Sequence, residues 1–263
     1  LLLAILPSTE SSRTALNQNG FILSMNKTKK PADRLIFHVD VNSAFLSWES
    51  ARRMKEGLPD LRDIPACIGG DPAKRTGIVV AKSIPAKKCG VQTGEPVAMA
   101  LRKCPNMVIV PSDFDLYVKC SRAFKKICAS YTPVMESFSI DEVFLDMTGT
   151  SLLYPDPIAA AHEIKDRISD ELGFTVNVGI STNKLLAKMA SDFEKPNKVH
   201  TLFPEEIPAK MWPLPVRELL FLGKASEKKL TEAGIRTIGD LAHARETDIQ
   251  TLIGNKNGHQ LYR

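Results

Sequence analysis

Residues 35–41 alternate strictly between two sets of side chains. The odd positions are all apolar and the even positions are mixed: Leu35, Phe37, Val39 and Val41 against Ile36, His38 and Asp40. This period-two alternation is typical of a β-strand with one buried face. It predicts that the Asp40 side chain lies on the face opposite the packed Phe37 and Val39.

Apolar spacing predicts further elements along the chain. Outside residues 57–106, the order is strand, helix, strand, helix, strand, strand, helix, strand, with the second strand at 107–110. The pair of strands lies within 134–147 and meets near residues 139–142. This order predicts an α+β fold with an antiparallel, ferredoxin-like sheet backed by helices.

Three segments fall outside that pattern. Residues 57–106 are basic and rich in short β segments, which predicts a small insertion with its own core. Residues 205–263 contain short apolar segments separated by glycines, which predicts an all-helical domain. Residues 1–33 are mostly polar after an apolar start, and we expect a tail outside the fold.

Composition excludes several classes of protein. The 263 residues carry a net charge of +5, which permits a nucleic-acid partner without requiring one. The five cysteines include no C-x-x-C pair, which favours reduced thiols in a cytoplasmic protein over a zinc site. No apolar run approaches the roughly 20 residues that a membrane helix needs.

Three carboxylates stand at predicted strand ends: Asp40, Asp141 and Glu142. Neighbours in a flat strand point to opposite faces, so Asp141 and Glu142 converge only if a hairpin turn or a bulge bends the chain there. Hard oxygen ligands without a histidine or cysteine suit Mg²⁺ or Mn²⁺. The alternative is that each acid caps a turn or pairs with a surface lysine.

The stretches 37–45 and 139–146 resemble the Y family of translesion DNA polymerases, of the DNA polymerase IV and UmuC-like type. The resemblance continues through residues 77–91, 178–191 and 195–197, in the family's order. It implies a right-hand architecture, with a palm over 34–56 and 107–204, fingers over 57–106 and a helix-hairpin-helix-like thumb over 205–263. It also implies a catalytic fragment, truncated before the little finger and the C-terminal region that would bind a sliding clamp.

The resemblance further implies the chemistry. The activity is template-directed addition of deoxynucleotides to a primer 3′-hydroxyl by a monomeric, cytoplasmic enzyme of DNA repair and damage tolerance. Asp40, Asp141, Glu142 and the Val41 carbonyl would hold two Mg²⁺ ions, with Mn²⁺ as a substitute. The triphosphate would contact one segment and two lysines: Val41, Asn42, Ser43, Ala44, Phe45, Lys87 and Lys184.

Two further roles come with the family. Phe45 would be a steric gate that leaves no room for a ribose 2′-hydroxyl. Taken in isolation, it is better interpreted as a core residue at the start of the first helix, and the surrounding motif favours the gate. Gly223, Lys224 and Ser226 would hold DNA phosphates through backbone N–H groups at a helix start.

Two other classes of function compete with the polymerase. One is a non-catalytic DNA-repair binding protein with a polymerase-like palm, which the loss of any of the three carboxylates would favour. The other is a different two-metal enzyme on a ferredoxin-like palm, such as a nucleotide cyclase, against which the insertion, Phe45 and the helical domain argue.

Overall fold

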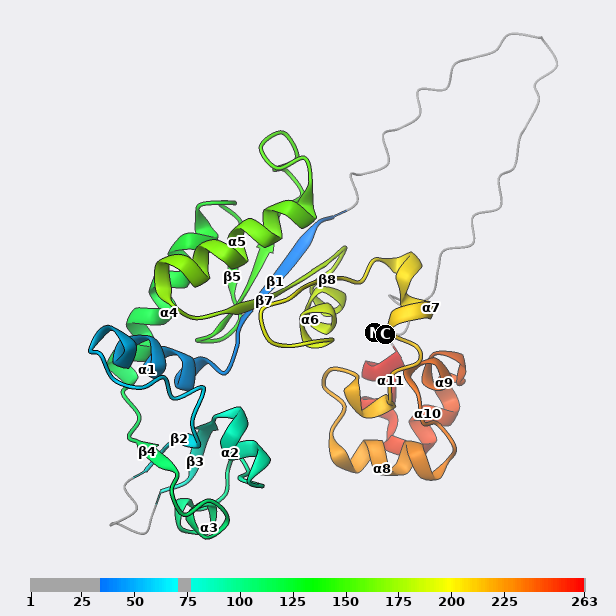
Figure 1. The fold of residues 1–263 in the computed structure, drawn as a ribbon. Helices are drawn as coiled ribbons and strands as arrows, with labels where there is room; N and C mark the ends of the chain where they lie inside the picture. Colours follow the sequence, from blue (N-terminus) through cyan, green and yellow to red (C-terminus); the bar gives the residue numbers. More distant parts are fainter. Residues whose placement is uncertain (1–33, 71–76, 263) are drawn as a thin grey trace, which may run out of the picture.

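The computed structural model describes residues 34–70 and 77–262, and the expected tail at 1–33 lies outside them. Its largest sheet has five strands in the order β5-β6-β1-β7-β8 (Figure 1). These strands are β1 (Ile36–Val41), β5 (Met135–Ser137), β6 (Glu142–Asp146), β7 (Val176–Ser181) and β8 (Val199–Thr201). β1 is central and runs antiparallel to both β6 and β7.

Helices cover both faces of this sheet. On one face, α4 (Phe114–Ala129) and α5 (Pro157–Leu172) pack over Phe37 and Val39, which are fully buried in the main core. On the other face, α6 (Lys184–Asp192) packs directly against β1 and β7. The alternation in β1 therefore separates an apolar face from the face that carries His38 and Asp40, as the sequence predicts.

The sequence analysis expects an antiparallel sheet, and the structure differs from this expectation at one edge. β8 pairs parallel to β7. The chain leaves β7, passes through α6 and returns as β8, and a helical crossover of this kind joins parallel strands. The edge strand β8 has only three residues, too few for an alternation to be recognised.

A second sheet has three strands in the order β3-β2-β4. These are β2 (Ala66–Gly69), β3 (Val79–Lys82) and β4 (Val108–Val110), accompanied by α2 (Ile84–Lys88) and α3 (Val97–Lys103). The sequence analysis places the strand at 107–110 in the large sheet, and that placement is wrong because β4 pairs parallel to β2. α1 (Ala44–Lys55) connects β1 to this region.

The chain beyond β8 is helical, as expected. Its elements are η2 (Pro204–Glu206), α7 (Ile207–Lys210), η3 (Val216–Glu218), α8 (Lys224–Glu232), α9 (Ile238–His243), α10 (Glu246–Ile253) and α11 (Asn255–Tyr262). Their core includes Leu186, Met189 and Ala190 from α6. Among the helices of residues 34–70 and 77–262, none has the length and apolar character needed to cross a bilayer.

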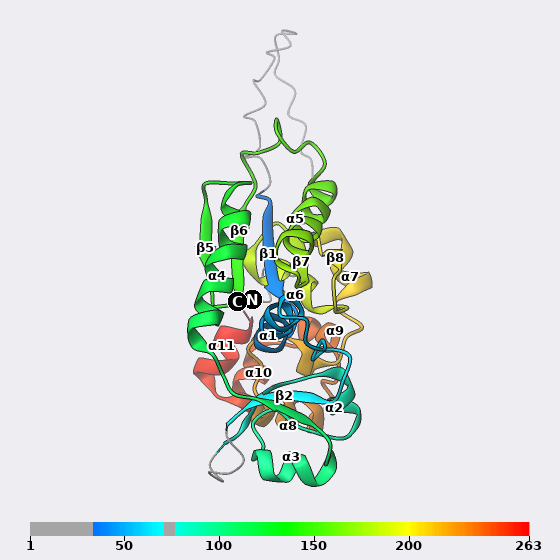
Figure 2. The same cartoon turned by 60° about the vertical axis from the view of Figure 1, so that its left-hand side comes forward.

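The small sheet and the helices α8–α11 lie at the same end of the large sheet, the end at which β1 finishes (Figures 1 and 2). Because Asp40 is the penultimate residue of β1, it lies at this end of the sheet. The fold thus places one carboxylate at the end of the large sheet near which both the small sheet and the helices α8–α11 lie.

Gly179 allows α6 to approach β7 closely. A Cβ at this position would lie 2.0 Å from the Ala187 carbonyl oxygen and 2.5 Å from the Ser191 backbone nitrogen. We expect Gly179→Ala to lower the free energy of unfolding by about 3 kcal/mol, because backbone atoms cannot yield as a flexible side chain would. Urea denaturation measures the change.

The matched control is Gly149→Ala, since a Cβ there meets no atom within 4 Å. Equal stability of the two variants would contradict the close packing of α6 on β7.

Candidate active site

Asp40 and Glu142 are direct neighbours across the β1–β6 ladder. Directly opposed residues of antiparallel strands project to the same face of a sheet. Asp40 is buried, with 8% of its surface exposed, and Glu142 is partly buried. The two carboxylates therefore share the face of the sheet that α6 covers.

Asp141 joins them through the turn between β5 and β6. The hydroxyl Oγ of Ser139 lies 2.5 Å from Asp141 Oδ1 and 3.0 Å from Glu142 Oε2. A hydroxyl has one hydrogen to donate, so it bonds one carboxylate at a time while both oxygens stay beside it. The bend lets two adjacent acids converge, as the sequence analysis requires for a shared centre.

Two lysines that the sequence analysis does not single out contact these acids. Lys188, on α6, forms an ion pair with Glu142. Lys195, just after α6, pairs with Asp40 and lies 2.8 Å from Asp192. The spacing of Lys184 and Lys188, four residues apart on one helix face, is the signal that the sequence offers for the first of them.

Burial controls the charges at the centre. It raises the pKa of Asp40 to about 6, although Lys195 opposes the shift. It also lowers the pKa of His38 to about 3, with a further contribution from the nearby lysines. His38 Nε2 lies 3.5 Å from Glu142 Oε1, and at neutral pH the His38 imidazole in this contact is uncharged.

The donor set fits a hard divalent cation. Carboxylate oxygens from Asp40, Asp141 and Glu142 suit Mg²⁺, which favours oxygen ligands and a few carboxylates. Within residues 34–70 and 77–262, however, no three acidic, histidine or cysteine side chains are arranged as a ready ligand cluster. Instead, Lys195 and Lys188 form ion pairs with Asp40 and Glu142.

The side chains of residues 42–45, which follow β1, differ in burial and in the contacts they make. The amide of Asn42 is buried and bonded to Asn177 and Thr175 (3.0 Å each), so it fixes the β1–α1 connection. Ser43 adopts a left-handed conformation (φ 48°) and is exposed. Ala44 is buried, and the half-buried Phe45 follows it in the first turn of α1.

Phe45 belongs to an aromatic cluster. Its ring centroid lies 4.6 Å from that of Tyr117, 5.8 Å from Trp48 and 6.5 Å from Phe114. The backbone N–H of Val41, at the end of β1, donates to the Asp141 carbonyl (3.0 Å). This bond places the 42–45 segment next to the turn that carries Asp141.

The two expected triphosphate lysines lie in different regions. Lys184, at the start of α6, pairs with Glu136 on β5 and lies 5.7 Å from the Phe144 ring centroid. Lys87 is exposed on α2 and has no ion pair among the residues that the structure describes. The structure thus places Lys184 on the helix that packs against the sheet carrying the acids, and Lys87 on a helix that accompanies the second sheet.

The expected DNA-contacting residues open α8. Gly223 is the N-cap and Lys224 the first helical residue, and both are exposed. The Gly223 carbonyl accepts from the N–H of Ser226 and of Glu227 (3.0 Å each). Gly223 and Ser226 also line a cavity of about 280 Å³ between this turn and α11.

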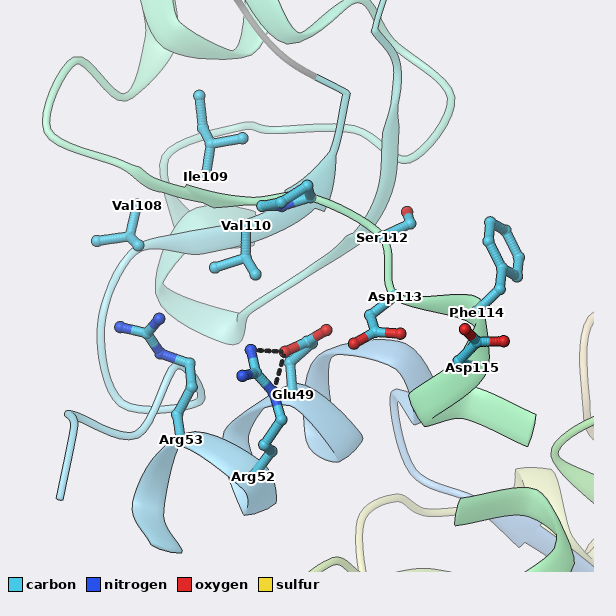
Figure 3. A pocket seen from close by; sticks show the side chains of 11 residues that line it. Glu49, Arg52, Arg53, Val108, Ile109, Val110, Ser112, Asp113, Phe114 and Asp115 are labelled. Carbon is cyan, nitrogen blue, oxygen red and sulfur yellow. Dashed lines mark hydrogen bonds and ion pairs between the residues drawn. The ribbon is translucent and has the colours of Figure 1, made fainter. Parts of the chain in front are cut away.

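A larger cavity of about 660 Å³ lies between α1 and the connection from β4 to α4 (Figure 3). Glu49 projects into this region from α1 and is hydrogen-bonded to Arg52 (2.8 Å), as the dashed lines in Figure 3 mark. Phe114 lies at the other side, on the first turn of α4. The lining includes none of the three candidate catalytic acids, so this cavity is separate from their centre.

Comparison with known proteins decides the family. The model of the impB/mucB/samB family matches residues 39–192, more than half of the chain. The chain belongs to this family. A second model, described as the thumb domain of DNA polymerase iota, matches residues 221–263.

Curated proteins similar to this chain are named as DNA polymerases. DNA polymerase IV of Clostridium acetobutylicum is 52% identical over 210 residues, covering 80% of this chain and 53% of that protein. DNA polymerase IV 1 of Bacillus subtilis is 42% identical over 221 residues, covering 84% and 52%. The chain spans about half the length of the curated relatives it matches.

Solved structures agree with the family. A crystal structure of DinB from Sulfolobus solfataricus has a TM-score of 0.76 at 25% identity and covers 86% of this chain and 65% of its own. A chimeric Y-family DNA polymerase gives 0.76 at 26%, with the same coverage. These matches confirm the Y-family resemblance and the right-hand fold class, with the large sheet as palm, the small sheet as fingers and the helices as thumb.

Proposed function

We propose that the chain carries the catalytic part of a translesion DNA polymerase, which adds deoxynucleotides to a primer 3′-hydroxyl opposite a template. The observation that supports the proposal is the direct pairing of Asp40 with Glu142 across the β1–β6 ladder, with Asp141 linked to Glu142 through the Ser139 hydroxyl. The names of the curated relatives support it. The alternative of a non-catalytic binding protein has no observation in its favour.

The proposed cofactor is a pair of Mg²⁺ ions, for which Mn²⁺ can substitute. Asp40, Asp141, Glu142 and the Val41 carbonyl would hold them. When bound, such ions activate the attacking hydroxyl and stabilise the leaving pyrophosphate. Ser139 keeps the Asp141 and Glu142 carboxylates turned toward a common point, which favours sharing of a cation between them.

The proposed nucleotide site runs along residues 41–45. Its backbone follows directly from β1, and Phe45 closes it by packing against the sugar where a 2′-hydroxyl would project. Lys184 and Lys87 would neutralise the triphosphate as point charges, one from the palm and one from the fingers. The proposed boundaries are fingers over 57–110, because β4 belongs to the small sheet, with the palm resuming at 111.

The proposed DNA contacts lie in the thumb at Gly223, Lys224 and Ser226. The first N–H groups of a helix lack intrahelical acceptors and attract phosphate without reading sequence. The match of residues 221–263 to a polymerase thumb supports this assignment. The substrates would then be primer–template DNA and deoxynucleoside triphosphates, bound by a monomer.

Metal removal tests the proposed function. At low salt, where phosphate contacts are strongest, we expect the chain to add one complementary nucleotide to a labelled primer in the presence of Mg²⁺. A chelator should abolish the addition, and excess Mg²⁺ should restore it. A primer that ends in a 3′-deoxy sugar is the control, because it lacks the attacking hydroxyl. Addition that persists in the chelator, or that never occurs, would contradict the proposal.

A further inference from the structure

The turn between β5 and β6 carries Asp141 and ends at Glu142. The Glu142 carbonyl accepts from the N–H groups of Phe138 (3.1 Å) and Ser139 (3.2 Å), and the Asp141 carbonyl accepts from Val41. Between these anchored peptides lie the carbonyls of Ser139 and Ile140. Each accepts a hydrogen bond from a side chain of α4, and the Ser139 carbonyl also has a longer contact (3.4 Å) from the Ser137 hydroxyl at the end of β5.

α4 supplies these donors from two residues four positions apart. The Lys125 ammonium donates to the Ser139 carbonyl (2.6 Å) and to the Ser137 hydroxyl (2.7 Å). The Ser121 hydroxyl donates to the Ile140 carbonyl. Residues at i and i+4 share one helix face, so the two side chains hold successive peptide groups of the turn from the same side.

Lys125 also places a positive charge near Asp141. Burial lowers the pKa of Lys125, and the nearby Asp141 carboxylate opposes that shift. Lys125 donates to the carbonyl of Ser139. The hydroxyl of the same Ser139 lies beside Asp141 and Glu142. One side chain of α4 is therefore connected to both carboxylates through a single residue.

We infer that Lys125 and Ser121 are positioning residues for the metal-binding carboxylates. By fixing the peptides of Ser139 and Ile140, they set the directions in which Asp141 and Glu142 leave the turn. Mg²⁺ demands near-ideal octahedral geometry, so a turn free to rotate would bind it less well. This inference rests on the proposed function, because it assumes that the carboxylates hold a divalent ion.

The test measures Mn²⁺ binding to the full chain by electron paramagnetic resonance, without turnover. Lys125→Met keeps the length of the side chain and removes the donors and the charge. We expect it to weaken Mn²⁺ binding about tenfold, equivalent to about 1.4 kcal/mol, and to raise the Mg²⁺ concentration for half-maximal nucleotide addition by a similar factor. Lys125→Arg retains charge and donors and should stay within about threefold of the unchanged chain.

The matched control is Lys126→Met, on the next residue of α4, which is exposed and has no ion pair among the described residues. A merely structural role for Lys125 would lower the thermal unfolding midpoint and leave Mn²⁺ affinity of the folded chain unchanged. Equal Mn²⁺ affinity of Lys125→Met and Lys126→Met would overturn the inference.

Ser121→Ala is a second test of the positioning role, and it leaves the charge of the chain unchanged. It removes only the donor to the Ile140 carbonyl, and we expect about a threefold loss of Mn²⁺ affinity. An unchanged Mn²⁺ affinity would show that Ser121 is not a positioning residue.

The double variant Asp141→Ala, Glu142→Ala separates the proposed metal site from the proposed positioning role. If the unchanged chain binds Mn²⁺ no better than this double variant, the metal site of the proposed function is wrong and the inference falls with it. If the double variant alone loses binding, the metal site stands and the positioning role is wrong.

Discussion

Asp40→Asn is expected to abolish nucleotide addition and to stabilise the folded chain at the same time. The activity should fall by about 10³-fold or more, since a metal ion supplies several kcal/mol of transition-state stabilisation and asparagine is a poor substitute ligand. Asp141→Ala, Glu142→Ala should lose activity to a similar extent. Single-turnover primer extension in saturating Mg²⁺ measures both losses.

The gain in stability follows from the sign of the pKa shift. Burial raises the pKa of Asp40 from 3.8 to about 6. Ionising Asp40 at pH 7 therefore costs the folded state about 3 kcal/mol relative to the unfolded state, at 1.36 kcal/mol per unit. Asparagine carries no charge to be desolvated, so the free energy of unfolding at pH 7 should rise by as much as about 3 kcal/mol.

The pH dependence provides the check. As the pH falls through about 6, the folded protein takes up the proton, and the advantage of Asp40→Asn should shrink and disappear near the ordinary value of 3.8. Urea denaturation in a chelator at a series of pH values measures it. The exposed Asp170→Asn variant is the control and should match the unchanged chain. A destabilised Asp40→Asn variant at pH 7 would show that the Lys195 pair outweighs the cost of burial.

Phe45→Ala is expected to let the enzyme accept ribonucleotides. The ring lies in the first turn of α1 beside Tyr117 and Trp48 and stays half-buried, and in the proposed function it packs against the sugar. Removing the ring opens space for a 2′-hydroxyl. We expect the ratio of kcat/KM for deoxynucleotide over ribonucleotide to fall about a hundredfold.

This ratio separates a gate from a core residue. Loss of a core side chain lowers both kcat/KM values together and leaves their ratio unchanged. Phe114→Ala is the control, because Phe114 belongs to the same aromatic cluster but is 64% exposed. An unchanged ratio for Phe45→Ala, or an equal fall for Phe114→Ala, would refute the gate.

Local patterns predicted the parts of the fold that depend on local sequence. The alternation in β1 indicated which face carries Asp40, and the apolar pattern of 134–147 predicted two strands that meet near residues 139–142. Strand pairing was harder, since the three apolar residues of β4 suit either sheet. Its partner β2 lies some 40 residues earlier in the chain, and no pattern within β4 identifies it.

The partners of the acids were missed for the same reason. Lys188 and Lys195 reach Glu142 and Asp40 only because α6 crosses β7 and β1 at close range. That approach depends on the absence of a side chain at Gly179, a requirement that the sequence of α6 does not reveal. Lys125 is likewise one of several lysines on α4, and only the packed turn distinguishes it.

Adjacent residues of α6 belong to different cores: Ala187 packs with Ile36 and Phe144 of the palm, and Leu186 packs within the thumb. A helix shared in this way leaves no surface along which the two regions could melt separately. We therefore expect the palm and the thumb to unfold as one cooperative unit, and amide hydrogens in α6 to exchange only when both open. If the thumb holds DNA as proposed, a force on that DNA would reach the large sheet in part through α6.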